Sequence, residues 1–146
     1  MIKIIKNILF IFLIYILLLS RSYSIETKAT AVYVLDAYSN KVLYEKNSDL
    51  HYGPASMSNL MIIYITCERL QNGSLKLDDN FVVSKKAWKY GGSKMFVKLG
   101  DKVSIDDLLK GVIVQSGNDA CIVLAEGISG SEENMLDEMA DKVKEL

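Results

Sequence analysis

The sequence predicts an α/β fold of the α+β kind, in which a β-hairpin precedes a helical cluster. Two short β-prone runs flank a polar turn early in the chain. Four longer apolar runs with helical spacing follow them. The chain has 146 residues, of which 50% are hydrophobic, and this is enough for one small domain rather than two.

Residues 1–24 have the pattern of a secretory signal peptide. Lys3 and Lys6 precede an uninterrupted apolar run over 8–19, and small residues alternate before a possible cut after Ser24. The alternative is an uncleaved membrane anchor, but the run of 12 apolar residues is short, since a spanning helix needs roughly 20. The sequence therefore predicts export, to the periplasm or the extracytoplasmic face of a membrane, and a mature domain over 25–146.

The charge of the mature part argues against a nucleic-acid partner. The signal segment holds three of the 17 Lys and Arg residues and none of the 18 Asp and Glu residues, so 14 basic residues face 18 acidic ones and the net charge is −4. An acidic surface gives no reason to expect nucleic-acid binding. A membrane contact is expected only through an uncleaved signal. With His51 as the one histidine of the chain, the sequence offers no zinc site.

Cys67 and Cys121 are the two cysteines of the chain. Export would permit a disulfide between them. Both lie within apolar helical patterns, however, where a buried free thiol behaves as a small hydrophobic group. Free thiols are the expectation, and the disulfide is the alternative.

The hairpin is predicted from residues 31–36 and 41–45, with the polar turn 37–40 between them. A hairpin alone is marginally stable in water, so it needs further strands or a helix as cover. A short strand is also predicted over 81–83, and a loop over 90–94.

Four helices are expected in the rest of the chain. The first runs over 56–72 and ends before Gly73, and its apolar residues lie almost all the way round, as in a buried central helix. The second begins at the capping box 104–107 and leads into Ser116. A third covers 120–128. The last begins near 130–133 and is expected to bury one face, formed by Leu136, Met139, Val143 and Leu146.

Two serine motifs could carry chemistry. Ser56 opens the first helix directly after Pro54-Ala55, and Ser116-Gly117-Asn118 follows the second. A nucleophilic serine needs a base within hydrogen-bond reach, and a residue three positions further along a helix lies on the same face. Backbone N–H groups at a helix start also favour an oxyanion. The simpler interpretation is a helix cap at Ser56 and a turn at Ser116.

Several segments in order resemble the low-molecular-mass serine D-alanyl-D-alanine carboxypeptidases of the penicillin-binding protein family. The family has linked Ser-x-x-Lys, Ser-x-Asn and Lys-Thr-Gly motifs. The resembling stretches are Pro54 to Met57, Ser84 to Trp88, Gly91 to Phe96 and Val114 to Ala120. The resemblance implies the N-terminal part of a β-lactamase/transpeptidase-like serine hydrolase domain with an incomplete sheet.

The resemblance also implies a role for each matching residue. Ser56 matches the acylated nucleophile, and Ser116 matches a second serine that passes protons. Asn118 matches a side chain that holds the substrate amide and the base lysine, and Gly91 and Gly92 match a loop at the cleft. The implied partners are peptidoglycan stem peptides ending in D-Ala-D-Ala, and β-lactams as acylating ligands. The family needs no metal and no cofactor.

Two departures from the family pattern predict impaired activity. Asn59 stands at the position of the base lysine, and an amide is no base near neutral pH. No Lys-Thr-Gly or Lys-Ser-Gly motif occurs in the chain, although the family places this motif on a strand that forms one wall of the cleft. His51 could replace the base only if it reached Ser56. The alternative function is a non-enzymatic exported remnant that binds peptidoglycan or a partner weakly.

Overall fold

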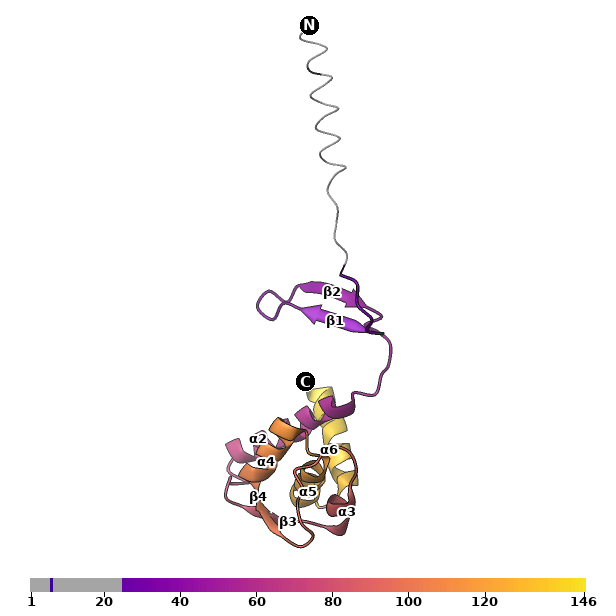
Figure 1. Cartoon of the computed structure of the whole chain (residues 1–146). Coiled ribbons are helices and arrows are strands. Elements are labelled where there is room, and N and C mark those ends of the chain that lie inside the picture. Colours follow the sequence, from indigo (N-terminus) through magenta and orange to yellow (C-terminus); the bar gives the residue numbers. More distant parts are fainter. Residues whose placement is uncertain (1–5, 7–24) are drawn as a thin grey trace. The chain divides into compact units, whose positions relative to one another are not determined.

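The structure is a computed structural model that describes Lys6 and residues 25–146. Apart from Lys6, the expected signal segment 1–24 lies outside the described residues. The chain forms two compact units, Met1–His51 and Tyr52–Leu146. In chain order the described elements are β1 (Val32–Leu35), β2 (Val42–Lys46), a 3₁₀ turn (Ala55–Ser58), α2 (Asn59–Gln71), β3 (Asn80–Val82), α3 (Lys85–Lys89), β4 (Lys102–Ser104), α4 (Ile105–Gln115), α5 (Asn118–Ser129) and α6 (Glu132–Glu145) (Figure 1).

The predicted hairpin is confirmed in the first unit. Strands β1 and β2 pair antiparallel, with Val34 opposite Tyr44. The carboxylate of Asp36 accepts hydrogen bonds from the backbone N–H groups of Tyr38 (3.0 Å) and Ser39 (2.7 Å) and so holds the turn. These bonds, that from Ser39 first, lower the pKa of Asp36.

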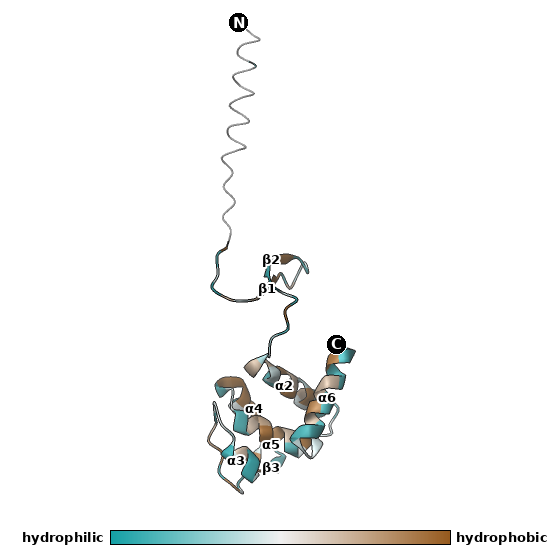
Figure 2. Cartoon of the chain, turned by 90° about the vertical axis from the view of Figure 1, so that its right-hand side faces the viewer, coloured by the Kyte–Doolittle hydropathy of each residue, from teal (hydrophilic) through white to brown (hydrophobic). Residues whose placement is uncertain are grey.

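Helix α5 is the centre of the second unit. Its residues from Asp119 to Ala125 are all buried, and it packs against α2, α3, α4 and α6. Figure 2 shows this helix mostly in the brown of hydrophobic residues. Leu124 of α5, Ile65 of α2, Leu108 of α4 and Met135 of α6 are among the most deeply buried side chains. The core is therefore a helical cluster, as predicted.

The first helix differs from its prediction in two ways. It begins at Asn59, and a 3₁₀ turn occupies the preceding four residues. Burial is also one-sided. Ile65 is 1% exposed, whereas Met57 and Leu60 are 69% and 65% exposed. The expectation of burial all round was wrong because α4, α5 and α6 pack against one side of this helix in the unit. Its predicted end is confirmed, since Gly73 has a positive φ of 78°.

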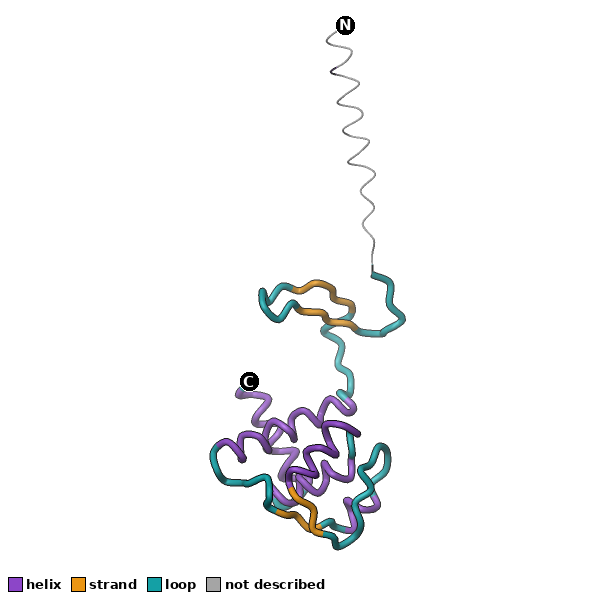
Figure 3. Tube along the Cα trace, turned by 60° about the vertical axis from the view of Figure 1, so that its left-hand side comes forward, coloured by secondary structure: helices purple, strands orange, loops and turns teal. Residues whose placement is uncertain are grey.

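A second two-stranded sheet joins β3 to β4 antiparallel, with Phe81 opposite Val103. The strand near 81–83 was expected, whereas β4 and the short helix α3 were not. Strand β4 has three residues, one of them lysine, and so gives no alternating pattern long enough to detect. The described residues thus hold two separate pairs of strands, shown in orange in Figure 3, and the sheet is incomplete.

Helix α4 begins as the capping box predicts. The hydroxyl of Ser104 accepts a hydrogen bond from the backbone N–H of Asp107 (3.1 Å). Within the described part of the chain, no helix combines the length and the apolar character needed to cross a membrane.

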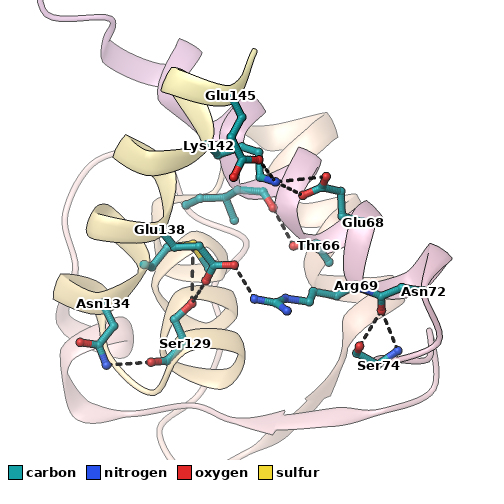
Figure 4. Close-up of polar contacts among 12 residues, drawn as sticks. Thr66, Glu68, Arg69, Asn72, Ser74, Ser129, Asn134, Glu138, Lys142 and Glu145 are labelled. Carbon is teal, nitrogen blue, oxygen red and sulfur yellow. Dashed lines mark hydrogen bonds and ion pairs between the residues drawn. The ribbon is translucent and has the colours of Figure 1, made fainter.

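Helix α6 buries a different face from the predicted one. Met135 is 1% exposed, whereas Leu136, Val143 and Leu146 are 54%, 62% and 75% exposed. Of the predicted face, Met139 packs against the core. The prediction was wrong because polar side chains, rather than apolar ones, join much of α6 to α2. Lys142 pairs with Glu68, and Glu138 pairs with Arg69 (Figure 4).

Candidate active site

Ser56 lies in the 3₁₀ turn that leads into α2. Pro54 has a φ of −70° and begins this turn, and Ala55 takes a positive φ of 47°. Ser58 closes it by donating its hydroxyl to the carbonyl oxygen of Ala55 (2.7 Å). Ser56 itself is exposed, and its hydroxyl makes no hydrogen bond among the described residues of the chain. The turn therefore leaves Ser56 accessible at the N-terminal end of α2.

Asn59 joins the two serine motifs. Its Nδ2 donates a hydrogen bond to Oγ of Ser116 over 3.0 Å, across 57 positions of sequence. Ser116 follows α4 in the left-handed conformation, with φ 52° and ψ 41°. This conformation ends the helix and turns the serine toward the start of α2. The structure thus brings Asn59 and Ser116 together.

Asn118 contacts the predicted glycine loop. Its Nδ2 donates to the carbonyl oxygen of Gly91 (3.1 Å), and its backbone N–H donates to that of Ser93 (2.8 Å). Gly92 has a φ of 83°, and a Cβ at this position would lie 2.5 Å from Nδ2 of Asn118. Ser93 in turn donates its hydroxyl to the carbonyl oxygen of Gln115. Gly91 and Gly92 therefore both lie against the side chain of Asn118.

A pocket extends from this contact between α2, α5 and α6. Ser58, Asn59 and Asn118 form its polar end, and Tyr90 and Glu132 also line it. Its apolar lining consists of Ile62, Cys121, Ile122, Ala125, Met135, Leu136 and Met139. Neither Ser56 nor Ser116 is a lining residue. The side-chain amides of Asn59 and Asn118 thus belong to the same pocket, whereas Ser56 and Ser116 lie outside its lining.

Among the described residues, no ionisable side chain forms a hydrogen bond with the hydroxyl of Ser56. Position 59 holds a neutral amide. His51 is the last residue of the first unit, whereas Ser56 lies in the second. Cys121 is buried, and its burial, reinforced by the charge of Asp119, raises the pKa of the thiol to about 12. This thiol stays protonated near neutral pH and is no nucleophile. Both cysteines are free, and Cys67 is exposed rather than buried as expected.

The described residues contain no group of three or more His, Cys, Asp or Glu side chains that could hold a metal ion. The arrangement instead offers hydroxyls, amides and backbone groups. These can position a polar ligand by hydrogen bonds. These groups of the described residues do not include a proton acceptor suited to neutral pH.

Sequence reasoning missed two residues that shape the site. Ser93 binds the end of α4 through Gln115, and the buried Asp119 accepts hydrogen bonds from the loop at Met95–Val97. Ser93 lies in a Gly-Gly-Ser stretch that indicates a loop and nothing more specific. An acidic residue in the first turn of a helix suggests only a favourable dipole interaction. Neither sequence feature predicts a contact with residues that are distant in the sequence.

Comparison with known proteins gives the same family from sequence and from structure. The family model described as D-alanyl-D-alanine carboxypeptidase matches residues 20–146. The D-alanyl-D-alanine carboxypeptidase DacC of Escherichia coli (strain K12) is 44% identical over 124 residues, which are 81% of this chain and 31% of DacC. The carboxypeptidase DacF of Bacillus subtilis (strain 168) is 37% identical over 126 residues, 86% of this chain and 32% of DacF.

A solved structure is similar over the same part of the chain. The D-alanyl-D-alanine carboxypeptidase DacD of Francisella tularensis superposes with a TM-score of 0.79 at 40% identity, and the match covers 85% of this chain and 30% of DacD. The chain therefore spans less than a third of the length of DacC, DacF and the solved DacD chain. The matched part of this chain includes the helical cluster and the incomplete sheet.

Proposed function

Because the chain belongs to the D-alanyl-D-alanine carboxypeptidase family, we propose that it forms part of the cleft of a serine carboxypeptidase whose acylation step is impaired. The substrate class is a peptidoglycan stem peptide ending in D-Ala-D-Ala, and β-lactams are the matching acylating ligands. Ser56 is the residue that would be acylated. The observation that carries the proposal is the hydrogen bond from the amide of Asn59 to Ser116.

The position of Ser56 supports its role as nucleophile. It is exposed and lies in the turn before α2. The free N–H groups and the positive dipole end of a helix start stabilise negative charge on a carbonyl oxygen under attack. What attack additionally requires is a group that accepts the proton of Oγ.

Asn59 does not supply that group. A lysine three residues after the serine could accept the proton as a neutral amine and could still donate to Ser116. The amide nitrogen of Asn59 donates to Ser116 but has no lone pair that accepts a proton near neutral pH. Loss of one member of a catalytic serine constellation costs roughly 10⁴ to 10⁶-fold in turnover. A loss of similar size is expected here.

The remaining residues keep groups suited to recognition. Asn118 would hold the amide of the peptide, with Gly91 and Gly92 as the loop beside it. Ser116 would pass protons between the leaving group and the base. Its hydroxyl already accepts a hydrogen bond from Asn59. In this chain a proton passed by Ser116 would therefore meet an amide, which does not accept it near neutral pH. No cofactor or metal is part of the proposed chemistry.

The second candidate function is binding without cleavage. Asn59 keeps the two motifs together through its hydrogen bond to Ser116, but its amide supplies no base. An exported remnant of this kind would bind peptidoglycan or a partner weakly. For both candidates we place the protein outside the cytoplasm, with a membrane contact only through an uncleaved signal.

Labelling with a fluorescent penicillin tests the proposal. The purified chain is compared with Asn59→Lys, Ser56→Ala and the double variant, and the labelled residue is located by mass spectrometry. We expect no label on the unmodified chain and slow labelling at Ser56 in Asn59→Lys. Rapid labelling of the unmodified chain at Ser56 would contradict impairment. Binding to an immobilised D-Ala-D-Ala peptide is measured on the same samples. If Asn59→Lys and the unmodified chain bind this peptide equally well and neither is labelled by penicillin, binding without cleavage is favoured.

Release of D-alanine provides a second measurement. The chain contains no Lys-Thr-Gly motif, so Asn59→Lys alone is not expected to hydrolyse the peptide with multiple turnovers. Robust D-alanine release by this variant would show that the motif is dispensable.

A further inference from the structure

We propose that Asp119 is a positioning residue of the site, which fixes the loop Gly91–Val97 against the turn Ser116–Asn118. The inference rests on the proposed function, because it assigns Asp119 to the same cleft. Asp119 is 1% exposed, one of the most deeply buried polar residues described. It lies in the first turn of α5, directly after Asn118.

The carboxylate of Asp119 collects the N–H groups of one loop. Its Oδ2 accepts hydrogen bonds from the backbone of Phe96 (2.9 Å) and Val97 (3.2 Å). Its Oδ1 accepts from the backbone of Met95 (2.9 Å) and from Ala120 in its own helix (2.9 Å). No lysine or arginine forms an ion pair with it in the described part of the chain. The charge is therefore compensated by backbone dipoles, three of which come from the loop.

The loop adopts a conformation that needs such support. Phe96 has a φ of 65°, which a residue with a side chain seldom takes. Phe96 is also 80% exposed, so packing of its side chain does not explain the conformation. Three consecutive N–H groups directed at one carboxylate do explain it, since the backbone must curl to bring all three to the same acceptor.

The same carboxylate lies against the turn that carries the site. A Cβ on Gly117 would lie 3.1 Å from Oδ1 of Asp119 and 3.1 Å from the backbone nitrogen of Met95. The loop, the turn and the carboxylate are therefore in close contact. On the other side of the turn, Asn118 contacts Gly91 and Ser93. Consecutive side chains thus hold two parts of one loop, Asn118 its beginning and Asp119 its end.

This arrangement gives Asp119 a function beyond stability. If the end of the loop is released, Asn118 loses the fixed position of its partner Gly91, and the turn at Ser116 is no longer constrained from behind. Misplacement of a positioned group by about 1 Å can cost about 10²-fold in rate. Asp119 itself is buried behind the turn and is not expected to touch a ligand.

The test compares Asp119→Asn with Glu126→Gln in the full chain by ¹⁵N NMR. Both variants neutralise a carboxylate on α5, but Oε2 of Glu126 is buried and has no hydrogen-bond partner among the described residues. We expect Asp119→Asn to shift the amides of Met95, Phe96 and Val97 and, in addition, the side-chain amides of Asn59 and Asn118. Glu126→Gln should leave these signals in place. Unchanged side-chain signals of Asn59 and Asn118 in a folded Asp119→Asn variant would overturn the proposal.

A second variant covers the case in which Asp119→Asn does not fold. Phe96→Gly accepts the positive φ without strain and should restore folding of the loop. In the double variant the side-chain amide of Asn118 should still be displaced; a signal identical to that of Phe96→Gly alone would overturn the positioning role. Penicillin labelling of Ser56 is a separate measurement, so failure of the proposed function leaves this spectroscopic result interpretable.

Discussion

Under the proposed function, Asn59 takes the position of the lysine in the Ser-x-x-Lys pattern, and its amide donates a hydrogen bond to the hydroxyl of Ser116. Both side chains can make that hydrogen bond, but only a neutral amine also accepts a proton. On this proposal, the substitution would keep the hydrogen bond made at position 59 and remove the proton acceptor. Helix α2 and the turn after α4 stay joined, and among the described residues no side chain forms a hydrogen bond with the hydroxyl of Ser56.

The hydrogen bond between Asn59 and Ser116 should be measurable as a contribution to stability. Asn59→Ala is expected to lower the free energy of unfolding by about 1 kcal/mol, because it removes one partly buried hydrogen bond. Ser116→Ala should cost a similar amount. In a double-mutant cycle measured by urea unfolding, the two changes should be less than additive, and full additivity would mean that the contact contributes nothing.

Gly92 gives a second prediction at the scale of one residue. Gly92→Ala adds a Cβ 2.5 Å from Nδ2 of Asn118 at a φ of 83°. The strain should lower the free energy of unfolding by about 1–3 kcal/mol and displace Asn118. Gly91→Ala is the matched control, since its Cβ would meet no atom within 4 Å. Equal thermal midpoints for the two variants would contradict this view of the loop.

Among the elements, α6 depends on charged side chains for its contact with α2. Hydrogen bonds from Lys142 to Glu145 and to Glu68 raise the pKa of Lys142. A raised lysine pKa contributes stability that is fully present below its ordinary value of 10.5 and is lost as the pH rises through the folded value. Lys142→Gln should therefore lower the thermal midpoint at pH 8, and its difference from the unmodified chain should shrink above pH 10.5.

Lys85→Gln serves as the control for this comparison. Lys85 is exposed and forms no ion pair among the described residues, so its replacement should leave the midpoint unchanged across the same pH range. A difference between Lys142→Gln and the unmodified chain that stays constant to pH 12 would show that charge pairing is not its cause.

The elements also show what could be predicted from sequence. The hairpin, α4 and the end of α2 follow from alternation, a capping serine and a glycine, which are local signals. The buried face of α6 does not. Its polar contacts Glu138 and Lys142 face α2, and an apolar pattern cannot reveal them. In the candidate site, the motifs drew attention to Asn59, Ser116 and Asn118, whereas the contacts of these residues and the loop contacts of Asp119 depend on tertiary folding.

The two units of the molecule differ in how much apolar surface each buries within itself. In the hairpin Tyr33 and Leu43 are 57% and 59% exposed, so its strands bury little apolar surface. A two-stranded hairpin of this kind is marginally stable. In the second unit, α5 is surrounded by α2, α3, α4 and α6. Local stability should therefore be low in the first unit and high in the second.

Hydrogen exchange of the full chain should resolve this difference. Peptides from β1 and β2 are expected to exchange within seconds, and those from α5 to be the slowest of the described residues. Ile65→Ala removes a side chain that is 1% exposed and should cost about 2–5 kcal/mol. It should accelerate exchange in α2, α4 and α5 together because they share one core, and leave the hairpin unchanged. Leu60→Ala, at a position that is 65% exposed, should change exchange little. If both substitutions destabilised the helices equally, the exposed side of α2 would have to be covered in solution.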